Sequence, residues 1–323
     1  MKEAHKIVYL GTPDFAVDSL DILVKNGYHI AAVVTAPDQP AGRGQQIRST
    51  PVKKYAVEHN LKVLQPEKLR NPEFIETLSA LEADLFIVVA FRMLPEIVWS
   101  MPALGTFNLH ASLLPDYRGA APINHAIING EKETGVTTFF IKQEIDTGEI
   151  LFREMIPIGP EETAGELHDR MKIAGARLVL KTVQAVFSNQ INPIDQTNLF
   201  DPSKPLKTAP KIFRDFCQIN WTMDTVSIYN KIRGLSPYPA AYTNLIPNEG
   251  EPVPIKIFKS QIATYTGDFP PGTIISDGIT RLSVTTGDGM IDILELQQAG
   301  KKAIKTEEFL RGFRLNSDWS IGV

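Results

Sequence analysis

Leu85-Phe-Ile-Val-Val-Ala90 is a continuous apolar run, and the sequence on both sides of it alternates between strand-like and helix-like patterns. Such runs are typical of parallel strands whose sheet is covered by helices on both faces. Two further runs that are mostly apolar, at residues 7–10 and 30–35, predict two more strands. Between the strands we expect three helices, at 15–26, 51–60 and 72–82. This alternation predicts an open, doubly wound, mostly parallel α/β sheet.

Start signals support three helices in this part of the chain. Thr50-Pro51 and Asn71-Pro72 each combine an N-cap residue with proline at the first helical position. Thr163-Ala-Gly-Glu166 reads as a capping box, which predicts a long helix ending near residue 189. Local signals of this kind fix where a helix begins, and they agree with the periodicity that follows each of them.

The composition and periodicity of the sequence change after that long helix. Residues 192–210 are rich in Pro, Asn, Asp and Ser and show little periodicity, so we predict a linker there. Beyond it we expect one helix at 222–234, followed by short strands separated by turns that contain Gly, Pro or Asp, which predicts a small β-barrel. The expected domains are therefore 1–191 and 211–323.

The composition is that of an ordinary globular protein, with 323 residues of which 43% are hydrophobic and 22% charged. No apolar stretch approaches the length of a membrane span, so no membrane association is expected. Cys217 is the only cysteine, which excludes an intrachain disulfide and favours a reducing, cytoplasmic location with a buried or neutral thiol. No apolar helix looks self-complementary, so we expect a monomer.

Charge is unevenly spread along the chain. The formal net charge of −4 argues against a uniformly basic nucleic-acid binder. From Lys207 onward, however, basic residues slightly outnumber acidic ones. This distribution permits a polyanionic partner for the carboxyl-terminal part without demonstrating one.

The segment from Asn108 to Gly119 reads Asn-Leu-His-Ala-Ser-Leu-Leu-Pro-Asp-Tyr-Arg-Gly and follows a strand-like run. Asn108 and His110 are two residues apart, so on a strand both side chains leave the same face. An amide can donate to a developing oxyanion, and an imidazole can accept and return a proton. Asp146 lies between strands expected at 136–141 and 149–158, and its carboxylate could orient the imidazole. These parts suit the transfer of an acyl group to an amine.

Each of these residues also has a plainer interpretation. Asn or His at a strand end is more often a turn or hydrogen-bonding residue, although the company of Ser-Leu-Leu-Pro115 and Arg118-Gly119 shifts the balance toward function. Asp146 precedes Thr-Gly and could be a simple turn residue. The residues alone leave these two readings of Asp146 evenly matched.

Other motifs are weaker. Gly11-Thr-Pro-Asp-Phe15 lacks the Gly-Xaa-Gly-Xaa-Xaa-Gly spacing, so no dinucleotide site is implied. No His/Cys cluster has zinc spacing, and no metal is expected. The Gly- and Pro-rich segment 37–48, with Arg43 and Arg48, is either a solvated loop or a contact for a phosphate-bearing substrate.

The block at 108–119, taken together with Asp146, resembles the signature of the folate-dependent formyltransferases. The resemblance extends over nearly the whole chain, and five further segments are similar to those family members that formylate methionyl-initiator tRNA: 11–16, 37–44, 232–237, 297–302 and 309–312. Gln39 departs from the pattern, because a basic residue is expected there, and this could soften the contact of that loop with RNA. The resemblance implies a Rossmann-like formyltransferase domain followed by a small OB-like β-barrel domain that binds tRNA.

The resemblance also implies roles for individual residues. Asn108, His110 and Asp146 would be catalytic, and the formyl donor would be 10-formyltetrahydrofolate, with no metal. The folate would be held by Phe91, Arg92, Met93, Leu94, Ser112, Leu113, Leu114 and Pro115. The tRNA would contact Arg43, Arg48, Lys211, Arg233, Lys301, Lys302 and Lys305.

Two other readings stay open at this point. The first is formyl transfer to a small amine, such as a nucleotide sugar or glycinamide ribonucleotide, which gives the 207–323 region no obvious purpose. The second is a catalytically silent RNA-binding protein, against which the presence of Asn108, His110 and Asp146 together argues.

Overall fold

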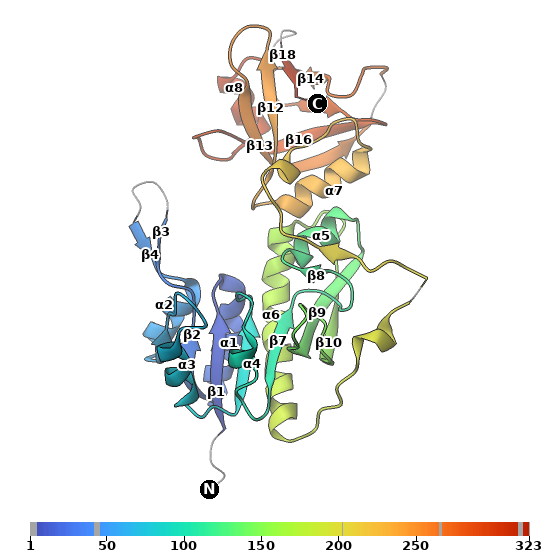
Figure 1. Cartoon of the computed structure of the whole chain (residues 1–323). Coiled ribbons are helices and arrows are strands. Elements are labelled where there is room, and N and C mark those ends of the chain that lie inside the picture. The colour runs from blue at the N-terminus through green and yellow to red at the C-terminus, as the bar shows by residue number, and fades with distance from the viewer. Residues whose placement is uncertain (1–4, 42–45, 202, 265–266, 316–318, 323) are drawn as a thin grey trace. The chain divides into compact units, whose positions relative to one another are not determined.

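The computed structural model describes residues 5–41, 46–201, 203–264, 267–315 and 319–322 (Figure 1). The chain divides into two compact units. One comprises the residues up to 119 together with 134–156 and 168–208, and the other comprises 120–133, 157–167 and the residues from 209 onward. Two short stretches from the middle of the chain therefore belong to the carboxyl-terminal unit.

Seven strands form the sheet of the first unit, in the spatial order β10-β9-β7-β6-β1-β2-β5 (Figure 1). The neighbours from β5 to β7 are parallel, and β9 is antiparallel to β7. This confirms the predicted mostly parallel α/β sheet. The strands are β1 (Lys6–Gly11), β2 (His29–Val34), β5 (Val63–Leu64), β6 (Leu85–Val89), β7 (Thr106–His110), β9 (Glu133–Phe140) and β10 (Ile150–Pro157).

The helices of this unit start where the caps predict. The Thr50 hydroxyl accepts a hydrogen bond from the Lys53 N–H, and the Asn71 side chain accepts one from the Glu73 N–H. Apolar residues of α3 and α4 pack with those of β1 and β6 in one core cluster. The elements are η1 (Asp14–Ala16), α1 (Val17–Lys25), α2 (Pro51–Glu58), α3 (Pro72–Ser79) and α4 (Glu96–Trp99), with a hairpin of β3 (Gln39–Ala41) and β4 (Gln46–Arg48).

The long helix α6 (Ala164–Phe187) begins at the predicted capping box, because the Thr163 and Glu166 side chains each bond to the other's backbone N–H. It packs closely on the sheet at β7. A Cβ placed on Gly175 would lie only 2.7 Å from a methyl carbon of Leu109, so the absence of a side chain permits the close approach. This contact supports the strand that carries Asn108 and His110.

The segment after α6, up to residue 208, packs against the first unit and is part of it. Ile194 and Ile150 exchange two backbone hydrogen bonds of 2.8 and 2.9 Å. The Tyr117 N–H donates to the Lys207 carbonyl. Composition alone had predicted a linker over 192–210, and these contacts between distant segments were not anticipated. The short elements here are β8 (Arg118–Gly119), η2 (Gln196–Leu199) and β11 (Thr208–Ala209).

The second unit is built on an antiparallel sheet in the order β14-β15-β16-β13-β12-β18, with β17 paired to β16. This near-barrel agrees with the predicted small β-barrel. Its strands are β12 (Ala241–Pro247), β13 (Val253–Ala263), β14 (Ile274–Ser276), β15 (Leu282–Thr285), β16 (Met290–Gln298), β17 (Ile304–Lys305) and β18 (Trp319–Ile321). Its helical elements are α5 (Pro122–Ile128), η3 (Asp215–Cys217), α7 (Thr225–Leu235) and α8 (Thr306–Gly312).

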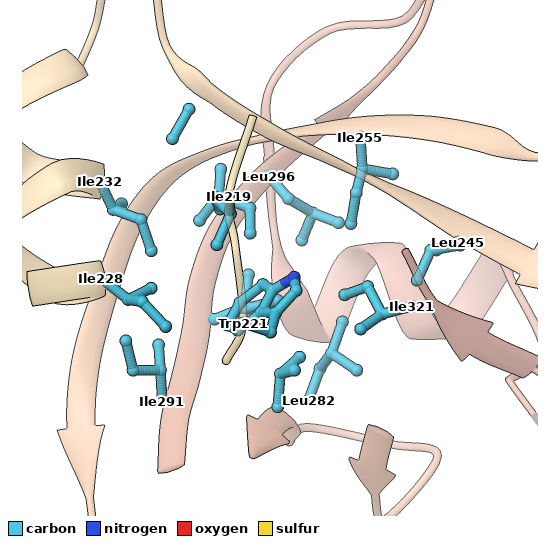
Figure 2. Packing of buried hydrophobic residues seen from close by; sticks show 14 of the residues in the cluster. Ile219, Trp221, Ile228, Ile232, Leu245, Ile255, Leu282, Ile291, Leu296 and Ile321 are labelled. Atoms are coloured by element: carbon cyan, nitrogen blue, oxygen red, sulfur yellow. The ribbon is translucent and has the colours of Figure 1, made fainter. Parts of the chain in front are cut away.

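Trp221 is fully buried in the core of this unit (Figure 2). Its indole N–H donates to the Thr243 hydroxyl over 3.2 Å, which satisfies the only polar atom of the ring. Cys217 belongs to the same apolar cluster, and burial raises the pKa of its thiol, as expected for a neutral side chain. Among the described residues, no helix has the length and apolar character needed to cross a bilayer.

Candidate active site

Strand β7, which carries the predicted catalytic residues Asn108 and His110, lies beside β6, which lies within the apolar run at 85–90. β6 and β7 are parallel neighbours, with Val88 opposite Asn108, so both strands end at the same edge of the sheet. In open α/β sheets this carboxyl edge is where ligands bind. Asn108 is half-buried and His110 is 6% exposed. Within the described parts of the chain, the side-chain amide of Asn108 has no hydrogen bond to any side chain or backbone group.

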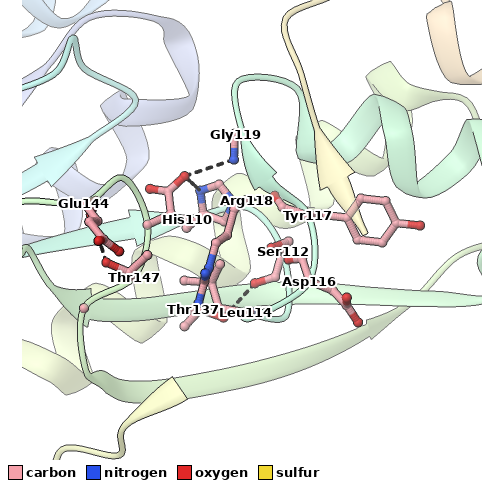
Figure 3. Close-up of polar contacts among 12 residues, drawn as sticks. His110, Ser112, Leu114, Asp116, Tyr117, Arg118, Gly119, Thr137, Glu144 and Thr147 are labelled. Atoms are coloured by element: carbon pink, nitrogen blue, oxygen red, sulfur yellow. Dashed lines mark hydrogen bonds and ion pairs between the residues drawn. The ribbon is translucent and has the colours of Figure 1, made fainter. Parts of the chain in front are cut away.

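The imidazole of His110 is held by a backbone group. Its Nε2 lies 2.9 Å from the Tyr117 carbonyl oxygen, and Tyr117 has a left-handed backbone with φ of 61° (Figure 3). Because a carbonyl only accepts, this contact requires the proton to be on Nε2. Nδ1 is then the nitrogen that can take up a proton, and it lies 3.9 Å from Oδ2 of Asp146. The tautomer is therefore set by Tyr117 rather than by Asp146, whose carboxylate faces the proton-accepting nitrogen.

The Asp146 carboxylate is anchored on a backbone N–H. Its Oδ2 accepts a hydrogen bond of 3.0 Å from Gly119 (Figure 3). Asp146 itself has a φ of 56°. Two residues on, a Cβ at Gly148 would lie 1.5 Å from the carbonyl oxygen of Phe140, so no side chain fits there. Thr147-Gly148, the pair that suggested a simple turn at Asp146, therefore helps to direct the Asp146 carboxylate toward His110.

A residue that sequence analysis missed also supports this loop. The buried side chain of Gln196 contacts the backbone of the Asp146 loop and the guanidinium of Arg118. No sequence signal marked it, because it lies in the segment whose composition suggested a linker.

The Ser112–Pro115 segment is fixed by a hydrogen bond within its own loop and by two bonds to Thr137 of β9. Ser112 is fully buried and donates to the Asp116 carbonyl, while Thr137 donates to the Ser112 carbonyl and accepts from the Leu114 N–H. Leu114 and Pro115 are buried. Leu113 alone among the four predicted folate contacts here is half-buried. Leu113 is therefore the residue of this segment that offers accessible apolar surface.

The Phe91–Leu94 segment presents a different mixture. Met93 is 69% exposed, and Phe91 is half-buried. Arg92 donates to the carbonyls of Pro66 and Glu67, and burial lowers the pKa of its guanidinium. Leu94 is buried in the core beneath. Phe91 and Met93 therefore supply the accessible apolar surface, while Arg92 stiffens the loop.

The basic residues predicted to meet tRNA fall into four groups. Arg43 lies outside the described residues. Arg48 is exposed at the end of β4, on a hairpin whose base is held by a bond from Lys53 to the Asp38 carboxylate, which lowers the pKa of that carboxyl. The remaining exposed members are all in the second unit: Lys211, Lys301, Lys302 and Lys305.

Arg233 does not belong with them, and the structure does not support a phosphate contact for it. Its side chain is 7% exposed and its guanidinium donates to the carbonyls of Gly159 and Glu162 over 3.2 and 3.0 Å. Its Nε donates to the Asn230 side chain. Burial lowers the pKa of this guanidinium. Arg233 ties helix α7 to the stretch 157–167 of its own unit.

Replacing Arg233 by alanine should therefore lower the free energy of unfolding by about 2–4 kcal/mol, because a buried side chain is lost together with its bonds to two part-buried carbonyls. Urea denaturation at constant m-value measures this change. Exposed Arg311 on α8 provides the matched control, since its replacement should change stability by about 0.5 kcal/mol or less. Unchanged stability of the Arg233 variant, combined with weaker RNA binding, would contradict the structural assignment.

Within the described part of the chain, no three His, Cys, Asp or Glu side chains gather as a metal site requires. The polar groups at the strand ends are instead an amide, an imidazole and a carboxylate. Such a set can stabilise an oxyanion and transfer a proton without forming a covalent bond to the enzyme.

Comparisons with known proteins identify the family of this chain. The formyl transferase family model matches residues 5–183, and the model of the formyl transferase carboxyl-terminal domain matches residues 211–314. Methionyl-tRNA formyltransferase of Bacteroides thetaiotaomicron is 51% identical over 320 residues, covering 99% of both chains. The protein of the same name from Flavobacterium johnsoniae is 46% identical over 316 residues, covering 98% of both.

Solved structures share the fold at lower identity. An N-formyltransferase from Helicobacter canadensis, in complex with folinic acid and dTDP-3-aminofucose, has a TM-score of 0.63 at 23% identity and covers 91% of this chain and 99% of its own. HypX from Aquifex aeolicus, in complex with tetrahydrofolic acid, has a TM-score of 0.63 at 17% identity and covers 98% of this chain and 51% of its own. Because one family model spans more than half of the chain and full-length relatives are about half identical to it, this chain belongs to the formyl transferase family.

Proposed function

We propose that this chain transfers the formyl group of 10-formyltetrahydrofolate to the α-amine of methionyl-initiator tRNA. The observation that carries the proposal is the strand-end site itself, in which the Asn108 amide has no partner in the described structure and the His110 Nδ1 faces the Asp146 carboxylate at 3.9 Å. The full-length relatives named methionyl-tRNA formyltransferase support the choice of acceptor. The solved relatives that hold folinic acid or tetrahydrofolic acid support a folate as donor.

The strand ends fit a folate in their chemistry. Exposed Met93 and half-buried Phe91 and Leu113 offer the apolar wall that a flat ring system needs. When bound, 10-formyltetrahydrofolate supplies a formyl carbon that is attached to nitrogen and open to attack by an amine. Among the other predicted folate contacts, Arg92 is exposed and bonded to the carbonyls of Pro66 and Glu67, whereas Leu94, Ser112, Leu114 and Pro115 are buried and fix the shape of this surface.

Each catalytic residue then has one task. Asn108 donates its amide N–H to the formyl oxygen as negative charge develops there. His110 takes a proton at Nδ1 from the amine as the new carbon–nitrogen bond forms, and returns it to the folate nitrogen as the old bond breaks. Asp146 stabilises the imidazolium between these two events, because its carboxylate faces Nδ1 while the Tyr117 carbonyl holds Nε2–H.

The second unit supplies the cations for an RNA partner. Lys301, Lys302 and Lys305 are exposed, and in the described structure none of them has a carboxylate within ion-pair distance. Lys211 lies with its ammonium 5.5 Å from the ring centre of Phe213, which is 66% exposed. A cation beside an exposed ring suits a polyanion that also presents bases. On the first unit, Arg48 on its hairpin is a further contact for the tRNA.

Replacing Lys301, Lys302 and Lys305 by glutamine should weaken tRNA binding and flatten its salt dependence. Each lost phosphate contact removes about 0.7–0.9 from the slope of log affinity against log salt, so a change of about 2 is expected if all three bind phosphate. Filter binding at several salt concentrations measures the slope, and kcat at saturating tRNA should stay unchanged. Glutamine at the exposed lysines 54, 62 and 68, which likewise have no ion-pair partner in the described structure, is the matched control. An unchanged slope would remove these lysines from the interface.

Single-turnover formyl transfer tests the function directly. The donor is 10-formyltetrahydrofolate, and the acceptors are methionyl-initiator tRNA, methionyl-elongator tRNA, glycinamide ribonucleotide and an amino-sugar nucleotide. Fast transfer to the initiator alone supports the proposal. Transfer to a small amine but to neither tRNA would establish the alternative. Truncation before residue 211 is the poorer test, because α5 packs against α7 in the second unit and would lose its partner.

A further inference from the structure

Gln196 is the first residue of η2, in the segment that follows α6. Its side chain is buried, with 2% exposed. Its Nε2 donates to two backbone carbonyls, those of Asp146 at 2.9 Å and Gly148 at 2.8 Å. Its Oε1 accepts from Arg118, at 2.6 Å from Nη2 and 3.2 Å from Nε. All of these residues belong to the first unit.

This arrangement uses both ends of the amide. A glutamine side chain has two N–H donors and one carbonyl acceptor, and here both donors meet carbonyls while the acceptor meets a guanidinium. Glutamate could keep the bond to Arg118 but could not donate to the loop carbonyls. A buried amide satisfied in this directional way specifies the position of what it bonds, whereas an apolar side chain would only fill space.

The two segments that Gln196 joins are the two that define the His110 environment. Asp146 supplies the carboxylate that faces Nδ1. Arg118 stands between Tyr117, whose carbonyl holds Nε2, and Gly119, whose N–H holds the Asp146 carboxylate. Movement of either segment would therefore change the distance between His110 and Asp146.

The position of Gln196 is itself fixed by its neighbours. Ile194 is bonded through its backbone to Ile150 at the start of β10. The Asp195 carboxylate accepts from both the N–H and the hydroxyl of Thr197, and these bonds lower the pKa of that carboxyl. The amide thus reaches the loop from a rigid base.

We propose that Gln196 is a positioning residue, which holds the Asp146 loop against the Arg118 segment so that the carboxylate stays in register with His110. The proposal rests on the formyl transfer assigned to this site. The Gln196 side chain is 2% exposed and its amide bonds only protein groups, so we expect its effect on the reaction to pass through the Asp146 loop. Misplacing a catalytic group by about 1 Å can cost on the order of 10²-fold in rate.

Two variants of the whole protein separate the possible roles. Gln196→Met removes all the bonds with little change of volume, and Gln196→Glu keeps the acceptor for Arg118 while setting a carboxylate oxygen against two carbonyls. We expect both variants to lower kcat for formyl transfer by about 10- to 100-fold, with the KM for folate changed less than about 3-fold. Gln190→Glu, at an exposed site three residues after the end of α6, is the matched control and should keep full activity.

A double-variant cycle shows whether Gln196 acts through Asp146. If it does, Gln196→Met combined with Asp146→Asn loses no more activity than Asp146→Asn alone. Losses that multiply in the double variant would overturn the proposal, as would wild-type kcat in both single variants.

A measurement that needs no substrate tests the positioning role of Gln196 independently of the proposed formyl transfer. The ¹⁵N chemical shifts of the His110 ring should move in the Gln196→Met protein and stay fixed in the Gln190→Glu protein. If the wild-type protein formylates none of the acceptors but the shifts move as expected, the function fails and the positioning stands. Unmoved His110 shifts in a folded Gln196→Met protein would overturn the positioning, whatever the acceptor.

Discussion

Replacing Asn108 by alanine lowers kcat by about 10²–10³-fold, the usual loss when one donor to an oxyanion is removed, and leaves thermal stability almost unchanged. Thermal stability should be almost unchanged for a structural reason. The amide of Asn108 is half-buried and is hydrogen-bonded to no side chain or backbone group that the structure describes, so its removal leaves no stranded partner. Single-turnover kinetics and thermal melting together measure the two effects.

Asn108→Asp sharpens the test, because it keeps the shape and reverses the electrostatics. A carboxylate cannot donate, and it repels the negative charge that develops on the formyl oxygen. The loss in kcat should therefore be about 10³-fold or more, greater than for alanine, with the KM for folate little changed. An Asn108→Asp protein with near wild-type kcat would rule out an oxyanion contact. An alanine variant that loses activity beside an aspartate variant that keeps it would show that the amide only fills space.

The fold was predictable because its signals are local. The apolar run at Leu85 predicts a strand buried on both faces, and β6 is fully buried. The caps at Thr50 and Asn71 act within three residues of themselves, so they can be read without knowing the tertiary structure. The alternation of Asn108 and His110 likewise follows from strand geometry alone.

The parts of the site that were not predictable depend on contacts between distant segments. Gln196 lies 50 residues from Asp146 in the chain, in a stretch without periodicity, so nothing local marks it. Arg233 sits in a helix among exposed and buried positions, and only the packing of α7 shows that its charge points inward to Gly159 and Glu162. The tautomer of His110 depends on the left-handed turn at Tyr117, which residue type does not reveal.

Among replacements of glycine by alanine in the first unit, Gly148→Ala should be the most damaging. The added Cβ would lie 1.5 Å from the carbonyl oxygen and 2.7 Å from the carbonyl carbon of Phe140. These are backbone atoms of β9, where Phe140 is paired with Phe107 of β7 and its N–H donates to the Glu149 carbonyl over 2.9 Å, so moving the strand would disturb this pairing. The loop that carries Asp146 must move instead. We expect the free energy of unfolding to fall by about 3–5 kcal/mol and kcat to fall by about 10²-fold or more.

Gly312→Ala provides the control, because a Cβ there meets nothing within 4 Å and stability should change by about 0.5 kcal/mol or less. Comparison with Asp146→Ala then separates the two effects of the Gly148 variant. If Gly148→Ala still folds and its kcat matches that of Asp146→Ala, the methyl group acts by displacing the carboxylate. If kcat stays near wild type in a folded Gly148→Ala protein, the loop has another arrangement that preserves the His110–Asp146 contact, and the close packing on Phe140 is not what positions it.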